Sequence, residues 1–149
     1  MNTLIFTHGV ADGIVSAAIS LAALGNEAKV FFTHPAGLYE DMLHNVRCEN
    51  KVVIVDIALN EAHLKELHIS SKSKRGVDIV YIDHHPEPLG IKLNEFPMTT
   101  IHNLNSSSSE LTFRYFENKL DEDVSRVAIY EAISDYLDVT PWVKRALKD

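Results

Sequence analysis

Short apolar runs alternate with helix-forming stretches from the start of the chain to about residue 100. Four runs are rich in β-branched and aromatic residues, as buried strands are, and a shorter fifth run follows them: residues 3–7, 29–33, 51–55, 77–82 and 99–102. Three stretches of helical composition lie between them: residues 14–24, 38–47 and 60–68. Strands that alternate with helices in this way predict a mostly parallel sheet.

Helices are expected to dominate after residue 102. Ser107 and Glu110 have the spacing of a capping box, Asp121 can cap a second helix, and Thr140-Pro141 can open a third with proline in its first turn. The whole pattern predicts a three-layer α/β/α domain. It has a mostly parallel sheet of about five strands and a helical carboxyl-terminal part.

Composition narrows the class of protein without specifying its chemistry. The 149 residues are 46% hydrophobic and 23% charged, which fits one globular domain over residues 1–149. The net charge of −7 argues against long duplex nucleic acid as a partner, because such binding relies on basic residues. The single cysteine, Cys48, excludes an internal disulfide and a thiolate metal cluster, and fits a reducing interior.

No segment has the features of a secretion signal or a membrane span. The longest apolar stretch, residues 14–24, is interrupted by Ser16 and Ser20 and is shorter than a bilayer requires. The sequence therefore predicts a soluble cytoplasmic protein without a membrane partner.

Acids and imidazoles follow three of the predicted strands directly. The first strand is followed by His8 and Asp12, the third by Asp56, and the fourth by Asp83-His84-His85. Since the carboxyl ends of parallel strands meet at one edge of a sheet, we expect these side chains to gather there. A mixed set of carboxylate and imidazole ligands is typical of a transition-metal site.

Each of these residues also has a simpler interpretation. Asp83-His84-His85 fits a polar turn after a buried strand, Asp56 fits a strand-end cap, and Asp12 fits an acid at a helix start, which is favourable without any metal. His102, at the end of the fifth predicted strand, is better explained as an ordinary buried or surface histidine.

Three of these segments resemble motifs one, two and three of the DHH phosphoesterases: residues 7–18, Val53-Ile54-Val55-Asp56 and Asp83-His84-His85-Pro86. Residues 105–116 are similar to the Ser-Ser-x-x-Glu-Leu stretch of that superfamily, and Ile133-Ser134-Asp135-Tyr136 looks like motif four. The superfamily includes RecJ-type exonucleases, nanoRNA and cyclic-dinucleotide phosphodiesterases, and family II inorganic pyrophosphatases. The resemblance covers nearly the whole chain, with the motifs in the correct order.

The resemblance implies a role for each matching residue. His8 would bind a first metal, Asp56 would bridge two metals, and the second metal would be held by Asp12, His84 and Asp135. His85 would face the phosphate and Asp83 would orient the histidines, so that these two are the expected catalytic residues. The implied cofactor is Mn²⁺ or Mg²⁺, as one or two ions.

Three smaller positions complete the expected site. Gly13 would let the backbone turn sharply behind Asp12. Ser107 and Ser108 are candidates for substrate contact, although they fit helix caps better.

The chain departs from the family pattern in two respects. The family has an aspartate two residues before Asp12, where this sequence has Val10, and valine cannot coordinate a metal. The family's enzymes also usually continue into a second, DHHA1-like domain with a glycine-rich substrate-binding motif, which we expect to be absent here.

These features leave three functional hypotheses. The first is a metal-dependent phosphoesterase that hydrolyses a phosphodiester or phosphoanhydride in a short oligonucleotide or another small phosphate-containing ligand. The second is a catalytically degenerate member of the fold that acts as a binding or regulatory protein. The third is a site completed by a homodimer or a partner chain, since one side of the cleft would otherwise be open to water.

Overall fold

The computed structural model describes residues 3–47, 51–59, 61, 77–90 and 92–148. Apart from Glu61, the predicted helix over residues 60–68 lies outside the described residues, and so does Cys48. The strands are β1 (Thr3–His8), β2 (Lys29–Thr33), β3 (Lys51–Val55), β4 (Asp78–Asp83) and β5 (Thr99–His102). The α-helices are α1 (Ala11–Leu24), α2 (Leu38–Asn45), α4 (Ser108–Phe116), α5 (Val124–Ser134) and α6 (Pro141–Ala146). Two 3₁₀ turns, η2 (Leu93–Glu95) and η3 (Glu117–Lys119), complete the described elements.

The five strands form one sheet in the order β2-β1-β3-β4-β5, and every described pair is parallel. Because the strands are parallel, His8, Asp56 and Asp83 all lie at or just beyond the same edge of the sheet. Strand β2 pairs on one side of β1, and β3, which follows β2 in the chain, pairs on the other side of β1. The carboxyl ends of β1 and β3 therefore flank the topological switch point, the place at which α/β proteins bind their ligands.

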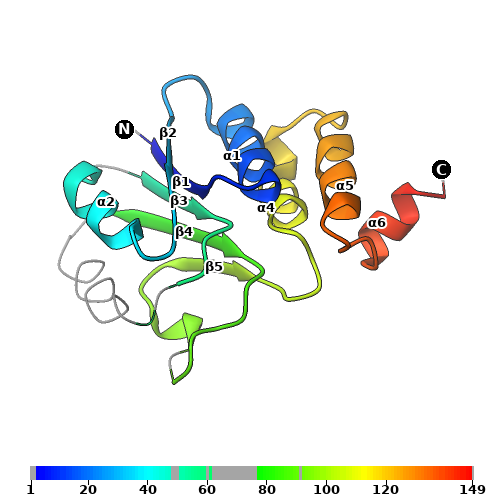
Figure 1. Ribbon diagram of the computed structural model, residues 1–149. Coiled ribbons are helices and arrows are strands. Elements are labelled where there is room, and N and C mark those ends of the chain that lie inside the picture. Colours follow the sequence, from blue (N-terminus) through cyan, green and yellow to red (C-terminus); the bar gives the residue numbers. More distant parts are fainter. Residues whose placement is uncertain (1–2, 48–50, 60, 62–76, 91, 149) are drawn as a thin grey trace.

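Helices cover both faces of the sheet (Figure 1). Helix α2 lies on one face, where alternate strand residues such as Phe6 and Ile54 pack against Leu38 and Met42. Helices α1 and α4 lie on the other face, where Ile5 and Val53 join Ala17 and Leu111 in a second core. The alternation of buried side chains along each strand thus builds two cores, and the three-layer α/β/α prediction is confirmed.

Helices α5 and α6 continue away from α1 and α4 on the same side of the molecule (Figure 1). Helix α5 packs on α1 and α4 through Ala128, which is fully buried beside Ile19 and Phe113. This third set of contacts brings the carboxyl end of α5 towards the switch point of the sheet. Among the described helices, none combines the length with the apolar character that crossing a bilayer requires.

The first helix was predicted over residues 14–24, but α1 begins earlier, at Ala11. Of the three helix caps predicted after residue 102, two are confirmed and one is wrong. Ser107 caps α4 by accepting a hydrogen bond from the Glu110 amide at 3.1 Å, and Thr140 caps α6 in the same way, with Pro141 following it. The predicted capping box forms only in half, because the Glu110 carboxylate accepts from the Thr140 hydroxyl at 2.9 Å instead. The prediction that Asp121 caps α5 was wrong, since α5 begins at Val124 after a turn.

Candidate metal centre

The acids and imidazoles of four separate segments meet at the switch point. Two overlapping groups of potential metal ligands form there, with the ligand atoms of each group within 4.8 Å of one another. One group contains Asp56, His84 and His85, and the other contains Asp12, His84 and Asp135. His84 belongs to both groups, so the five side chains form one continuous cluster.

Asp12 lies in the first turn of α1 and is almost fully buried. Its two carboxylate oxygens accept hydrogen bonds from the backbone amides of Ser108, at 2.7 Å, and Ser109, at 2.8 Å. These amides belong to the first turn of α4, where the helix has unpaired N–H groups and a partial positive charge. The amino terminus of α4 therefore fixes the orientation of Asp12.

Asp56 follows β3 with a backbone φ of 55°, in the left-handed region that few residues other than glycine, asparagine and aspartate adopt. This conformation ends the strand and directs the carboxylate into the site. Asp56 Oδ1 accepts from the Ser108 hydroxyl at 3.2 Å. Asp56 Oδ2 is buried and has no hydrogen-bond partner among the described residues.

His84 lies between these two carboxylates. Its Nε2 is 3.4 Å from Asp56 Oδ1 and 3.6 Å from Asp12 Oδ2. Hydrogen bonding to Asp56 raises the pKa of His84, against the opposing effect of burial. The two neighbouring carboxylates therefore favour the imidazolium form of His84.

Asp83, the last residue of β4, orients His85. Its Oδ1 accepts from His85 Nδ1 at 2.8 Å, and its Oδ2 accepts from the His85 amide at 3.2 Å and from the buried Tyr81 hydroxyl at 2.7 Å. Since a carboxylate only accepts, Nδ1 carries the proton and Nε2 is left to face a ligand. The bond to Asp83 raises the pKa of His85.

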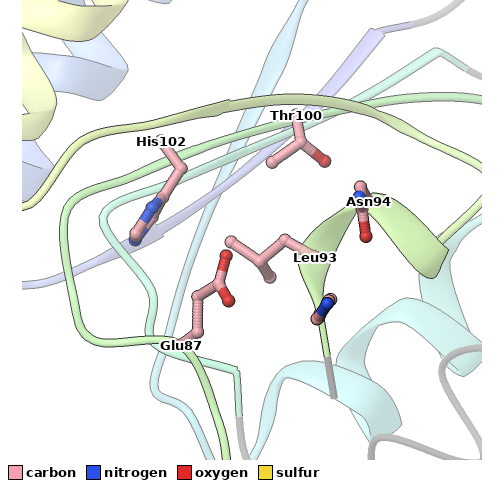
Figure 2. Close-up of a pocket in the computed structure, with 6 residues that line it drawn as sticks. Glu87, Leu93, Asn94, Thr100 and His102 are labelled. Carbon is pink, nitrogen blue, oxygen red and sulfur yellow. The ribbon is translucent and has the colours of Figure 1, made fainter.

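His102 supports the same loop from β5. Its Nε2 donates to the carbonyl oxygen of His85 at 2.6 Å, although the sequence favoured an ordinary histidine here. His102 and Thr100 also line a pocket of about 360 Å³ whose described lining includes none of the candidate ligands. Figure 2 shows their side chains there together with Glu87 and Leu93. His102 thus ties the wall of this pocket to the backbone that carries His85.

The cluster opens into a pocket of about 360 Å³. Its described lining combines acids and histidines with a few smaller groups: Val10, Ala11, Asp12, Asp56, His84, His85, Glu131, Ser134 and Asp135. Asp135 is the exposed residue that ends α5. Val10 lines the pocket where the family pattern has an aspartate, and the side chain is 48% exposed. His8 lies outside both ligand groups found among the described residues.

Glu131 is a pocket residue that the sequence analysis missed. It lies on α5 one turn before Asp135, so the two acids share a face of the helix. The only signal in the sequence for this placement was that Glu131 stands four residues before Asp135. Burial, the charge of Asp12 and a side-chain hydrogen bond to Asp12 raise the pKa of Glu131 to about 8.

Ser107 and Ser108 are completely buried, and the described lining of the pocket does not include them. Ser107 is the cap of α4, as the simpler interpretation expected. Ser108 supports the site from behind, since its amide holds Asp12 and its hydroxyl holds Asp56.

A divalent cation fits this set of residues. A buried carboxylate oxygen without a partner, Asp56 Oδ2, is costly in a folded protein unless a cation or a proton compensates it. Four carboxylates line the pocket, and its described lining contains no lysine or arginine. The mixture of carboxylate and imidazole suits Mn²⁺ or Mg²⁺ better than a thiophilic metal.

The protein without metal is expected to lose stability as the pH rises from about 5 to about 8. His84, His85 and Glu131 all have raised pKa values, so the folded state binds more protons than the unfolded chain. The contribution of each group to folding stability is complete below its pKa in the unfolded chain. It is lost as the pH rises through the pKa of the same group in the folded protein. For buried Glu131 the window runs from 4.5 to about 8. At about 1.4 kcal/mol per pKa unit, the loss is on the order of a few kcal/mol.

Urea denaturation in EDTA at several pH values measures this effect. The Glu131→Gln variant removes the largest contribution and should flatten the profile above pH 6. A native profile that rises between pH 5 and pH 8 would contradict the expectation.

One protein family matches the chain over most of its length. The DHH family, N-terminal domain, matches residues 2–139. No curated protein sequence matches the chain.

Solved structures share the fold at low sequence identity. The exonuclease RecJ bound to manganese superposes with a TM-score of 0.66 at 21% identity, covering 98% of this chain and 41% of that one. An uncharacterized protein from Helicobacter pylori G27 gives a TM-score of 0.68 at 13% identity, covering 91% and 44%. RecJ from Thermus thermophilus, in complex with Mn²⁺, gives 0.62 at 20% identity, covering 90% and 21%. The chain thus spans less than half the length of each of these structures.

Proposed function

Because this chain belongs to the DHH family, which it matches through that family's N-terminal domain, we propose that it is a metal-dependent phosphoesterase. Its substrate is a phosphodiester or phosphoanhydride in a short nucleotide or a similar small molecule. The observation that carries the proposal is the pocket in which two ligand groups overlap at His84. The manganese in the two RecJ structures supports Mn²⁺ as the cofactor.

The charges in the pocket support metal dependence on physical grounds. An anionic phosphate that approached the carboxylates of Asp12, Asp56 and Asp135 directly would be repelled. Divalent cations remove that repulsion, polarise the phosphate and lower the pKa of a water molecule. Asp12, Asp56, His84 and Asp135 would hold such cations, with His84 common to both ligand groups.

His85 has the geometry of the residue that contacts the substrate. Asp83 holds the proton on Nδ1, which leaves Nε2 unengaged by Asp83. Nε2 can then stabilise a phosphate oxygen or exchange a proton with it. The raised pKa of His85 favours the cationic form, which is the form that binds phosphate. Tyr81 and His102 fix Asp83 and the His85 backbone, respectively.

A direct assay tests the proposal. The purified chain, supplied with Mn²⁺ or Mg²⁺, is expected to hydrolyse at least one of three compounds: an activated aryl phosphodiester, a dinucleotide and a phosphoanhydride. The His85→Ala variant should lose about 10²- to 10⁴-fold of that rate, as is usual for a general acid or base. The proposal fails if none of the three is hydrolysed, or if His85→Ala retains the native rate.

The catalytically degenerate alternative rests on Val10 and has its own test. Val10 is the N-cap residue of α1, with an extended backbone but no side-chain cap. An aspartate there should cap α1, which is worth about 0.5–2 kcal/mol, and also supply a carboxylate to the pocket. We expect Val10→Asp to tighten Mn²⁺ binding about tenfold or more, by analogy with other ligand-shell changes. If Val10→Asp is active and the native chain is inactive, the degenerate alternative is correct.

A further inference from the structure

Glu131 occupies a position that structural needs alone do not explain. It comes from the middle of α5, only 5% of its surface is exposed, and its carboxyl group faces the pocket with the candidate ligands. Carboxylic acids are rarely buried to this extent unless they are paired or bind a cation. A glutamate at this place therefore needs a compensating partner.

The neighbours of Glu131 supply only part of that compensation. Its Oε2 accepts a hydrogen bond from the Ser109 hydroxyl at 3.1 Å. The charges of Asp12 and Asp135, and a side-chain hydrogen bond with Asp12, raise the pKa of Glu131, so both acids disfavour its charged form. Two carboxyl groups that face each other share either a proton or a cation.

Two further observations in the same pocket favour a cation. Asp56 Oδ2 is buried without a hydrogen-bond partner among the described residues, and Asp56 is 1% exposed. Asp12, His84 and Asp135 place their ligand atoms within 4.8 Å of one another. Glu131 lines the same pocket but lies outside both ligand groups found among the described residues, so binding the same cation would require its side chain to move towards them.

We propose that Glu131 is an additional ligand of the divalent cation held by Asp12, His84 and Asp135. The inference rests on the proposed metal-dependent function. It gives this cation three carboxylates and one imidazole, a set rich in hard oxygen ligands that suits Mn²⁺ and Mg²⁺. Asp135 and Glu131, one helical turn apart, then bind the cation together, so that metal binding anchors the carboxyl end of α5.

Calorimetric titration of the EDTA-treated full chain with Mn²⁺ tests the role of Glu131 without any substrate. Glu131→Gln keeps the size of the side chain and can still accept from Ser109, but it binds cations poorly. We expect it to weaken one Mn²⁺ site at least tenfold, comparable to other losses from metal sites. Glu122→Gln, a change on the exposed turn before α5, lowers the net negative charge equally and should leave the affinity unchanged.

Thermal unfolding of the same proteins separates a ligand from a structural residue. Without metal at pH 8, Glu131→Gln should unfold at a higher temperature than the native chain, because a buried charge has been removed. With saturating Mn²⁺, the increase in unfolding temperature should be smaller for Glu131→Gln than for the native chain. Ser109→Ala, which removes the hydrogen bond but keeps the carboxylate, should retain Mn²⁺ affinity within about threefold.

Each outcome bears on a different claim. If the native chain binds Mn²⁺ and Glu131→Gln binds it equally tightly, the assignment of Glu131 is wrong and the proposed function stands. If the native chain binds no Mn²⁺ at all, the proposed function fails first. A Glu131→Gln variant that loses stability both with and without metal would identify Glu131 as a structural residue and overturn the assignment.

Discussion

Replacing Asp56 with asparagine is expected to abolish metal-dependent turnover while leaving the protein about as stable as the native chain. Asp56 is the only acid in the first ligand group, and its Oδ2 has no partner among the described residues. Asparagine removes the charge that attracts a cation. Since changes to groups that merely support a metal ligand already cost 10- to 100-fold, we expect this loss in Mn²⁺ affinity to exceed about 100-fold.

The fold should tolerate this change for two reasons. Asparagine, like aspartate, adopts the left-handed backbone conformation that the φ of 55° requires. Its carbonyl oxygen can also accept from the Ser108 hydroxyl in place of Asp56 Oδ1. The change removes a buried carboxylate oxygen that has no partner, which is stabilising, and the ion pair with His84, which is destabilising. The free energy of unfolding in EDTA should therefore stay within about 1 kcal/mol of the native value.

Mn²⁺ titration, activity and urea denaturation of Asp56→Asn measure these effects together. Asp78→Asn is the matched control, because Asp78 lies at the start of the neighbouring strand β4 and pairs with Lys51 at 3.3 Å, away from the pocket. The control should keep native affinity and activity. Retained Mn²⁺ affinity in Asp56→Asn would show that this acid is not a ligand.

Replacing Gly13 with alanine is expected to destabilise the protein and disable the site together. A Cβ atom at this position would lie 2.3 Å from the carbonyl oxygen of His8 and 3.0 Å from Asp56 Oδ2. The first contact is with backbone, so β1 or α1 must move. Overpacking of this kind costs about 1–3 kcal/mol, and it reverses the gain of about 1 kcal/mol that alanine normally brings to a helix.

The same displacement should reduce the turnover rate by more than the loss of stability alone would cause. The Thr7 hydroxyl donates to the Gly13 carbonyl oxygen at 2.6 Å, so β1 and the first turn of α1 move as one unit. Asp12 lies in that turn, and a misplacement of about 1 Å at a reacting centre can cost on the order of 100-fold in rate.

Gly9→Ala supplies the control, because a Cβ atom at Gly9 would meet nothing within 4 Å. Urea denaturation and Mn²⁺-dependent activity should both remain close to native in Gly9→Ala. Gly13→Ala with native stability would mean that the contact between α1 and β1 is looser than the structure indicates.

Gly13 also illustrates a prediction that reached the right residue for the wrong reason. The sequence suggested a sharp turn behind Asp12, but Gly13 lies within the first turn of α1. The structure requires glycine there because the helix approaches the His8 carbonyl oxygen and Asp56 too closely for any side chain. Such a close approach depends on how α1 packs on β1 and β3, and a turn signal cannot express it.

The strands and most helix starts could be predicted from sequence because the determinants are local. Alternation of apolar residues, Ser107 before Glu110 and Thr140 before Pro141 all act within one turn or one strand. The start of α5 was misplaced for a related reason: Asp121 has the chemistry of a cap, yet a turn continues to Val124 before the helix begins.

The sequence by itself determined the layered fold and the residues that gather at one edge of the sheet, because parallel strands must end together and motif order places Asp12, Asp56 and Asp83-His84-His85 at those ends. Only the tertiary structure decided how they are held. Helix α4 fixes Asp12 through amides about 96 positions away in the chain, His102 supports His85, and α5 brings Glu131 beside Asp12. These contacts depend on the docking of whole helices, which is governed by the burial of their apolar faces and is not encoded near the residues that meet.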